Sequence, residues 1–399
     1  MDFPESEYQE RVGRARELMR RYEFDGIMLT GDFSAAPNYR YFSGHSPRDF
    51  QLNFARPHVM LLTASGEATL VVYHVNAENA ADTSWVTDIR EYTQPFRAEA
   101  VIQAVKDVGL DRGRIGAELG LEQRLFMPVL EYQRLEEGLP NASFVDGSDL
   151  LWDLRTIKSP AEVERIRRAD LINHRALKAA LQHLRPGMTE ADVFKTVASV
   201  MIQEGADRPP FSQILSTSSP KFRRGGHRSR FLGPSTEPLN EGDLVFVDSG
   251  CVIDGYWGEF NRMGVVGQPT DHQRKVHETI RTIVRRSIAE AFKPGNTHRE
   301  VMEHMVGLYR EFGLDESQYR RYMQYPYAHL GHGIGLTSSE PPLTRMDNDD
   351  VLRPGMTISV EAYLRDEIVY GSEEDILITE DGAEILSDVD EGLYCGAEA

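Results

Sequence analysis

The second half of the sequence contains an internal repeat, and this repeat constrains the fold more than any other feature. Residues 184–194 resemble residues 292–302, because each segment has Pro-Gly, then a Thr, then an acidic residue three positions later. Such a Thr is typical of a helix N-cap. Residues 241–248 likewise resemble residues 354–361, in which a glycine leads into a strand that carries a carboxylate. The repeat therefore predicts two related halves arranged about a pseudo-twofold axis.

The two repeated strands carry Asp248 and Glu361 in equivalent positions. Side chains alternate between the two faces of a strand, so each acid shares its face with the residues two and four positions before it. Burying a carboxylate at the end of an apolar strand costs free energy unless an opposite charge or a metal ion compensates it. The repeat therefore predicts that both acids belong to one functional site.

Three further residues complete a candidate metal site. Asp254-Gly255 predicts a hairpin turn, and the hairpin brings Glu259 toward Asp248. His332 lies between glycines, and Glu374 precedes another strand. Four carboxylates and one imidazole favour Mn, Fe, Co or Zn, and two such metals sharing carboxylates activate water and polarise a carbonyl. Any one acid alone is better interpreted as surface charge, but five such residues on strand ends of repeated halves are not.

Composition limits the class of protein. A length of 399 residues predicts two domains, and a net charge of −19 argues against binding to nucleic acid or anionic membranes. The acidic N-terminus lacks a secretory signal, and no apolar run has the ~18–20 residues that span a membrane. Only two cysteines occur, so a disulfide framework is excluded. We therefore expect a cytoplasmic protein.

The chain divides into a domain of residues 1–153 and a domain of residues 154–399. In the first, residues 10–22 are amphipathic and predict a helix, whereas four short apolar runs predict strands at 26–30, 58–62, 68–73 and 114–118. This alternation is typical of an α/β domain. In the second, Ser159, Pro160 and Glu162 form a capping box that predicts the start of a long helix.

Five segments of the second half resemble the "pita-bread" superfamily of creatinase, prolidase, aminopeptidase P and methionine aminopeptidase. They are residues 155–162, 247–250, 331–336, 354–361 and 374–382. The first half, including residues 38–44, is similar to the N-terminal domain of the creatinase and prolidase branch. The resemblance implies an α/β N-terminal domain followed by an α+β pita-bread catalytic domain with a pseudo-twofold repeat.

The resemblance also implies the metal ligands. The family carries Asp, Asp, His, Glu and Glu, and the matching residues here are Asp248, Glu259, His332, Glu361 and Glu374. The centre implied is a pair of divalent metals per chain, either Mn, Fe, Co or Zn. Glu361 would be the general base and His227 a second catalytic residue. Glu259 departs from the family Asp; creatinase also has Glu there and works without metal, but it lacks the first Asp.

The residues that handle substrate depart further from the peptidases. Ser339 stands where the peptidases carry a second histidine, and residues 371–373 lack the arginine that commonly precedes the last ligand. The resemblance implies that five residues of this chain lie near the site and bind substrate: Phe54, Arg56, His329, Ser339 and Arg345. Arg56 is either a substrate-carboxylate ligand reaching a neighbouring subunit's pocket or an ordinary surface arginine.

The resemblance implies a metallohydrolase, which would cleave a short peptide or small amide as Xaa-Pro dipeptidases and aminopeptidases do. Two alternatives are a creatinase-like hydrolase of a small carboxylated metabolite and a metal-dependent lyase of the dimethylsulfoniopropionate-lyase kind. A metal-free binding protein is disfavoured by the retained ligand-type residues. The expected partners are a small-molecule or dipeptide substrate and a second copy of the chain, with the N-terminal domain near the neighbour's site.

Overall fold

The structure is a computed structural model that describes residues 2–48, 54–208, 211–218, 233–319, 329–366, 368–386 and 392–396. The chain folds into two compact units, Met1–Arg155 and Thr156–Ala399. Each unit has its own sheets and its own hydrophobic core, and each is described separately below.

The first unit is built on a six-stranded mixed sheet with the strand order β4-β3-β2-β1-β5-β6. The strands β1, β2 and β3 pair antiparallel, and the outer pairs are parallel. The strand bounds are β1 Gly26–Gly31, β2 His58–Thr63, β3 Ala68–Tyr73, β4 Asp88–Tyr92, β5 Arg114–Ala117 and β6 Ser143–Asp146. The four central strands are apolar and buried, which is why their short hydrophobic runs were recognisable in the sequence.

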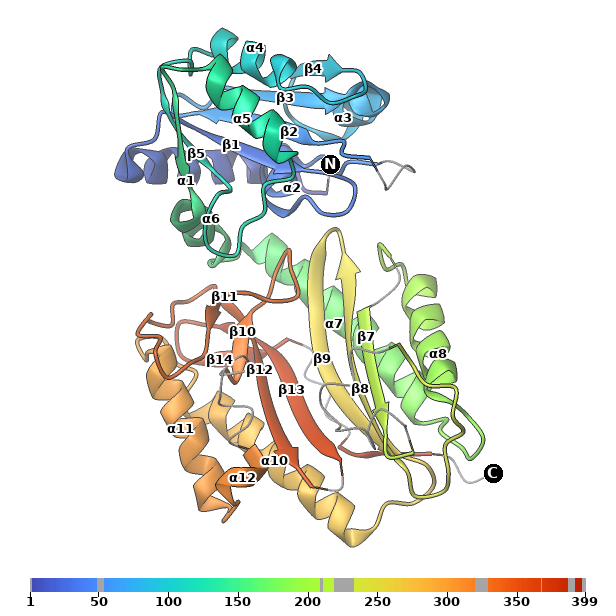
Figure 1. Ribbon diagram of the computed structural model, residues 1–399. Helices are drawn as coiled ribbons and strands as arrows, with labels where there is room; N and C mark the ends of the chain where they lie inside the picture. The colour runs from blue at the N-terminus through green and yellow to red at the C-terminus, as the bar shows by residue number, and fades with distance from the viewer. Residues whose placement is uncertain are drawn as a thin grey trace. The chain divides into compact units, whose positions relative to one another are not determined.

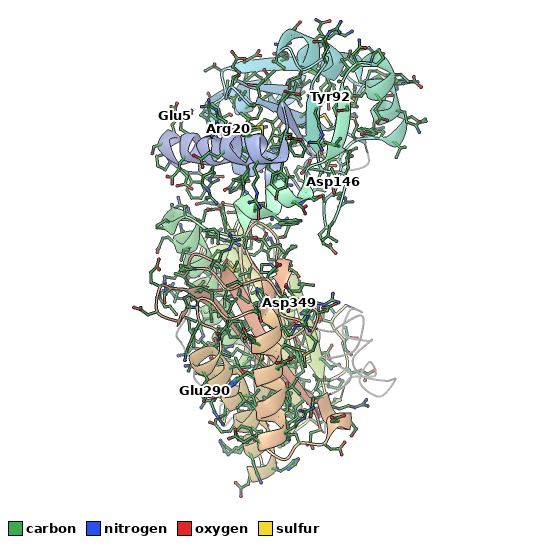
Figure 2. The ribbon with its side chains drawn as sticks, turned by 90° about the vertical axis from the view of Figure 1, so that its left-hand side faces the viewer. Glu5, Arg20, Tyr92, Asp146, Glu290 and Asp349 are labelled. Atoms are coloured by element: carbon green, nitrogen blue, oxygen red, sulfur yellow. The ribbon has the colours of Figure 1, made fainter. Side chains whose placement is uncertain are left out.

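Helices surround this sheet (Figure 1). They are α1 Glu5–Tyr22, α2 Pro37–Ser43, the 3-10 helix His74–Asn76, α3 Ala77–Thr83, α4 Glu99–Asp107, α5 Val129–Gly138 and α6 Ser148–Arg155. Helix α1 begins five residues before the predicted start, since its polar first turn lies outside the amphipathic pattern. Figure 2 marks Glu5 and Arg20, which lie in its first and last turns and so complement the helix dipole. The predicted α/β class is confirmed.

The second unit contains two sheets. One has the order β11-β10-β12-β13-β14 and the other β15-β9-β8-β7. The strand bounds are β7 Phe211–Ser216, β8 Leu244–Ile253, β9 Tyr256–Val265, β10 Gly331–Gly333, β11 Glu340–Leu343, β12 Thr357–Arg365, β13 Val369–Ile378, β14 Ala383–Ile385 and β15 Tyr394–Cys395. The hairpin β8–β9 and the hairpin β12–β13 form the centre of the unit, side by side in Figure 1.

Helices cover the outer faces of these hairpins. They are α7 Pro160–Leu181, α8 Glu190–Gln203, α10 Asp271–Glu290, α11 His298–Glu311 and α12 Glu316–Tyr319. One apolar core joins α10 and α11 to β12 and β13, and another joins α7 and α8 to β8 and β9. Ser159 caps α7 with Glu162, as the sequence predicts.

The predicted repeat is visible in the backbone. Thr189 and Thr297 cap α8 and α11 with complete capping boxes. Gly242 and Gly355 precede β8 and β12 with φ of 83° and 89°, a left-handed conformation that glycine adopts at little cost. The repeated glycines therefore turn the chain into two equivalent strands, and these strands carry the predicted acids.

No helix in the described part of the chain is both long and apolar enough to cross a bilayer.

Candidate metal centre

The hairpin β8–β9 supplies the first two carboxylates. Asp248 pairs with Asn261 across the ladder and Glu259 pairs with Gly250, so the two acids occupy a diagonal position on one face. The turn is made by Asp254 and Gly255, with φ of 50° and 85°, which match the predicted tight hairpin. The structure thus brings Asp248 and Glu259 to the same face.

The hairpin β12–β13 and the short strand β10 supply the rest of the site. Glu361 lies directly opposite Glu373, and His332 on β10 pairs with Ser359, two residues before Glu361. One ligand atom each from His332, Glu361 and Glu373 lies within 4.8 Å of the others. Among the described residues, these three buried side chains form a candidate metal-ligand cluster.

The sequence predicts Glu374 as the fifth ligand, but in the structure its neighbour Glu373 lies beside His332 and Glu361, so we expect Glu373 in that role. Glu374 pairs with Val360 and points to the opposite face of β13, where Arg262 Nη2 lies 2.8 Å from its Oε2 and Arg285 Nη2 lies 3.4 Å from its Oε1. Two adjacent acids on a strand always face opposite sides, and sequence alone does not say which one faces the site.

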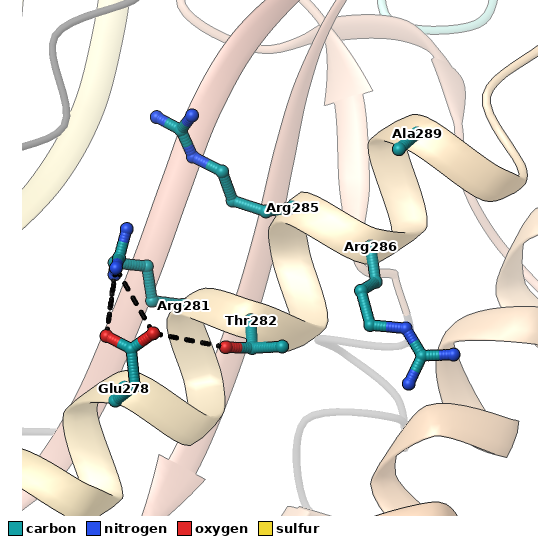
Figure 3. A pocket seen from close by; sticks show the side chains of 6 residues that line it. All are labelled: Glu278, Arg281, Thr282, Arg285, Arg286 and Ala289. Carbon is teal, nitrogen blue, oxygen red and sulfur yellow. Dashed lines mark hydrogen bonds and ion pairs between the residues drawn. The ribbon is translucent and has the colours of Figure 1, made fainter.

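Arg285 reaches Glu374 from a pocket on helix α10. This pocket, of about 300 Å³, is lined by Glu278, Arg281, Thr282, Arg285, Arg286 and Ala289. Figure 3 shows Arg285 and Arg286 pointing in opposite directions, and Arg281 is paired with Glu278. The three guanidinium groups each have a carboxylate partner, so the positive charge beside this pocket is compensated.

The acids of the centre are buried together. Asp248, Glu259, Glu361 and Glu373 are 5%, 8%, 8% and 2% exposed. Burial, followed by the charge of Asp248, raises the pKa of Glu259 well above its usual value, and burial with the charges of Asp248 and Glu361 does the same for Glu373. Glu259 Oε2 has no hydrogen-bond partner among the described residues. Closely packed buried carboxylates with an unsatisfied oxygen fit a divalent cation, which would favour their charged forms.

The surroundings of His332 favour the form of imidazole that binds metal. His332 Nδ1 lies 3.1 Å from the carbonyl oxygen of Gly333, so that nitrogen donates and Nε2 is left with a lone pair. Burial lowers the pKa of His332, which favours the neutral form that binds metals. The neutral imidazole and the carboxylates form a nitrogen and oxygen donor set that suits Mn, Fe, Co or Zn.

His329 and Tyr363 hold Glu361 from two sides. His329 Nδ1 lies 3.1 Å from Oε1, and the Tyr363 hydroxyl donates to Oε2 at 2.7 Å. Burial alone would raise the pKa of Glu361, but the contacts with His329, His332 and Tyr363 outweigh it and lower the pKa to about 2. Burial would likewise lower the pKa of His329, but Glu361 raises it. Glu361 is therefore held in its ionised form.

Several polar residues that the sequence did not predict lie next to the candidate ligands. Ser359 and Asn261 donate to the two oxygens of Glu373 at 2.7 Å each. The backbone N–H of Glu259 donates a hydrogen bond to the carboxylate of Asp375 at 2.9 Å. Burial raises the pKa of Asp375 to about 7, and its partner Asp170 on α7 is also buried. Ser359, Asn261 and Asp375 each lie two residues from a predicted or candidate ligand, a spacing that every second residue of a strand shares, and Asp170 on helix α7 has no such signal.

The predicted substrate-binding residues fall in different environments. Arg345 forms a two-pronged ion pair with Asp347, at 2.8 Å for each contact, and Ser339 is exposed next to the buried Glu340. His227, the predicted second catalytic residue, lies outside the described residues. These three stay predictions.

Arg56 and Phe54 belong to the first unit. Arg56 is buried, donates to Gln94 Oε1 at 2.6 Å and stacks on Tyr73 at 5.0 Å, whereas Phe54 is 61% exposed. Arg56 is thus not an ordinary surface arginine in this unit, and its role toward substrate stays a prediction.

The donor set and its two hairpins are the arrangement expected of a metal-dependent hydrolase, and the similarity to known proteins shows this class. Residues 164–380 match the model of metallopeptidase family M24, and residues 11–157 match the creatinase/prolidase N-terminal domain. The chain belongs to metallopeptidase family M24, and the predicted superfamily and two-domain pita-bread architecture are confirmed. Membership implies the use of divalent metal.

Relatives along the whole chain are named as peptidases. The Xaa-Pro dipeptidase of Pyrococcus furiosus is 28% identical over 391 residues, which cover 96% of this chain and 99% of that protein. The solved prolidase of Pyrococcus horikoshii is 27% identical, with a TM-score of 0.76 and coverage of 96% and 99%. An Xaa-Pro dipeptidase structure from Bacillus anthracis has a TM-score of 0.79 at 24% identity, covers 97% and 99% of the two chains, and supports the fold.

Proposed function

We propose that the protein is a metal-dependent dipeptidase that hydrolyses the peptide bond before proline. The observation that carries the proposal is the buried cluster of Asp248, Glu259, His332, Glu361 and Glu373. The similarity to Xaa-Pro dipeptidases, which extends over both units, supports the choice of substrate. The creatinase-like and lyase alternatives become outcomes of the test.

Each side chain of the cluster has a task in this mechanism. The four carboxylates and His332 Nε2 would hold divalent metal. We propose two metal ions per chain, as the family resemblance implies. With metal held by these residues, the site would have a nucleophilic hydroxide available near neutral pH and could polarise the scissile carbonyl. Glu361, kept ionised by His329 and Tyr363, can accept a proton at its carboxylate. His227 is proposed to steady the reacting carbonyl.

Activity on a substrate panel tests the proposal. We expect the protein with added Mn²⁺, Co²⁺ or Zn²⁺ to hydrolyse Xaa-Pro dipeptides, and expect dialysis against a chelator to abolish this activity and metal readdition to restore it. The measurement is proline release, with Xaa-Ala dipeptides, creatine and dimethylsulfoniopropionate as comparison substrates. Turnover of creatine without metal, or elimination from the sulfonium compound in place of dipeptide hydrolysis, would refute the proposal.

We also propose that the protein acts as a cytoplasmic homodimer in which Arg56 binds the substrate carboxylate in the partner's site. The two cysteines are free, as in a reducing compartment. The planar guanidinium of Arg56 suits bidentate carboxylate recognition. Its place on the short segment before β2 puts it next to the exposed Phe54.

The Arg56→Ala variant tests this role. It should raise the KM for a dipeptide at least tenfold, about 1.4 kcal/mol of lost binding, while metal content stays unchanged. Arg90→Ala, which removes an arginine paired with Asp88 and Asp107 in the same unit, is the control and should keep the wild-type KM. An unchanged KM for Arg56→Ala would remove Arg56 from the site, and light scattering would report the dimer.

A further inference from the structure

We infer that Tyr363 is a positioning residue that fixes the orientation of the Glu361 carboxylate in the metal centre. The inference rests on the proposed metal centre, though not on the identity of the substrate. Tyr363 lies two residues after Glu361 on β12, so strand alternation places both side chains on one face. Its hydroxyl lies 2.7 Å from Glu361 Oε2, the length of a strong O–H···O⁻ hydrogen bond.

Tyr363 is itself held in place. Its backbone N–H donates to the Tyr309 hydroxyl at 3.0 Å, and that hydroxyl donates to the Tyr363 carbonyl oxygen at 3.0 Å. The ring packs against Phe246 with 6.4 Å between centroids, and the residue is 6% exposed. A buried ring with a fixed backbone samples few rotamers, so its hydroxyl is presented to Glu361 in one direction.

The space for this ring is created by a glycine. Gly371 on β13 lies directly opposite Tyr363. A Cβ at Gly371 would lie 3.0 Å from Tyr363 Cε1, 2.9 Å from Asn261 Oδ1 and 2.7 Å from Phe246 Cε2. Any larger residue would push against the Phe246 ring, the Tyr363 ring that packs on it, and the asparagine that holds Glu373. Tyr363 and Gly371 therefore form a matched pair beside the two acids of this hairpin.

The hydroxyl has a defined effect on ligation. A carboxylate oxygen has two lone pairs, so the hydrogen bond from Tyr363 occupies one on Oε2 and leaves the other for a cation. With His329 beside Oε1, the plane of the Glu361 carboxylate is fixed before any metal binds. Hydrogen bonds to metal-ligating side chains typically change metal affinity about 10–100-fold. We expect Tyr363 to contribute to the metal affinity of this chain on that scale.

The test compares wild type with Tyr363→Phe, which keeps the ring and removes only the hydroxyl. Titration with Co²⁺, followed by calorimetry and by the visible absorption of the bound ion, should show a dissociation constant raised about 10–100-fold and an altered absorption band. Tyr370→Phe is the control, because Tyr370 is a buried tyrosine on the opposite face of the same hairpin, and it should match wild type.

A second variant, Gly371→Ala, tests the same inference in the Co²⁺ titration. Gly371→Ala keeps the Tyr363 hydroxyl but places a Cβ against Phe246, Asn261 and the Tyr363 ring, and should also weaken Co²⁺ binding. If Tyr363→Phe folds, binds Co²⁺ as tightly as wild type and has the same spectrum, the positioning role is overturned while the metal centre stands. If wild type binds no Co²⁺, the proposed metal centre and this inference both fail.

Discussion

The Glu373→Gln variant is expected to lose metal binding and, with it, dipeptide hydrolysis. Glu373 lies opposite Glu361 and within 4.8 Å of the ligand atoms of His332 and Glu361. Glutamine keeps the size of the side chain but removes its charge, so we expect metal affinity to fall by more than about 100-fold, beyond the range seen for outer hydrogen-bonding partners. Calorimetric titration with Zn²⁺ or Mn²⁺ measures the loss, and metal content of the purified protein confirms it.

Glu374→Gln is the matched control for this prediction. The change is chemically the same and one residue away, but the side chain faces Arg262 and Arg285 on the other side of β13. We expect this variant to be less stable, since the buried Arg262 loses the negative charge that Glu374 places beside it, yet to bind metal as wild type does at a temperature where it is folded. The opposite pattern, metal lost with Glu374→Gln and kept with Glu373→Gln, would reverse the corrected ligand assignment.

The Lys158→Met variant should lower the free energy of unfolding by about 3–5 kcal/mol. Lys158 Nζ lies 2.7 Å from Glu340 Oε1, and the two side chains are 2% and 1% exposed. Removing the ammonium leaves a buried carboxylate without a counter-charge. Glu340 also accepts a hydrogen bond from Thr337, so the pair anchors the segment between His332 and β11. Urea unfolding followed by circular dichroism measures the effect.

Two further variants serve as comparisons for Lys158→Met in this measurement. Lys195→Met breaks an exposed Lys195–Asp192 pair, 73% and 43% exposed, and should change stability by at most about 1 kcal/mol. Lys158→Met combined with Glu340→Gln removes both buried charges and should recover most of the lost stability. If Lys158→Met unfolds at the wild-type urea concentration, the pair does not stabilise this unit.

Much of the fold was predictable because it depends on local patterns. The repeated Pro-Gly-Thr segments specify two capped helices, and Asp254-Gly255 specifies one hairpin. Those patterns were enough to predict that Asp248 and Glu361 lie on equivalent strands and that a hairpin brings Glu259 toward Asp248. The second hairpin, and the short strand that places His332 beside Glu361, are seen only in the structure.

The errors and omissions have a common cause in cross-strand register. Whether Glu373 or Glu374 faces Glu361 depends on how β13 aligns with β12, which is set by packing and not by the run of acids itself. The sequence places Tyr363 on the face of Glu361 but does not show that Gly371 on the facing strand leaves space for its ring. Pairwise fits of this kind leave no mark in a single sequence.

The division of the four carboxylates has a consequence for the origin of the fold. Each hairpin supplies two acids, so a single half contains only part of a centre, whereas two identical halves related by a dyad would assemble a complete one. Duplication and fusion of such an ancestor would account for the present arrangement. Fusion also permits divergence, and among the described strands β10 of the second half carries His332, whereas β7 of the first half places Gln213 opposite Asp248. This asymmetry makes the two ends of the centre different. A centre needs such a difference if its substrate is to bind in one direction.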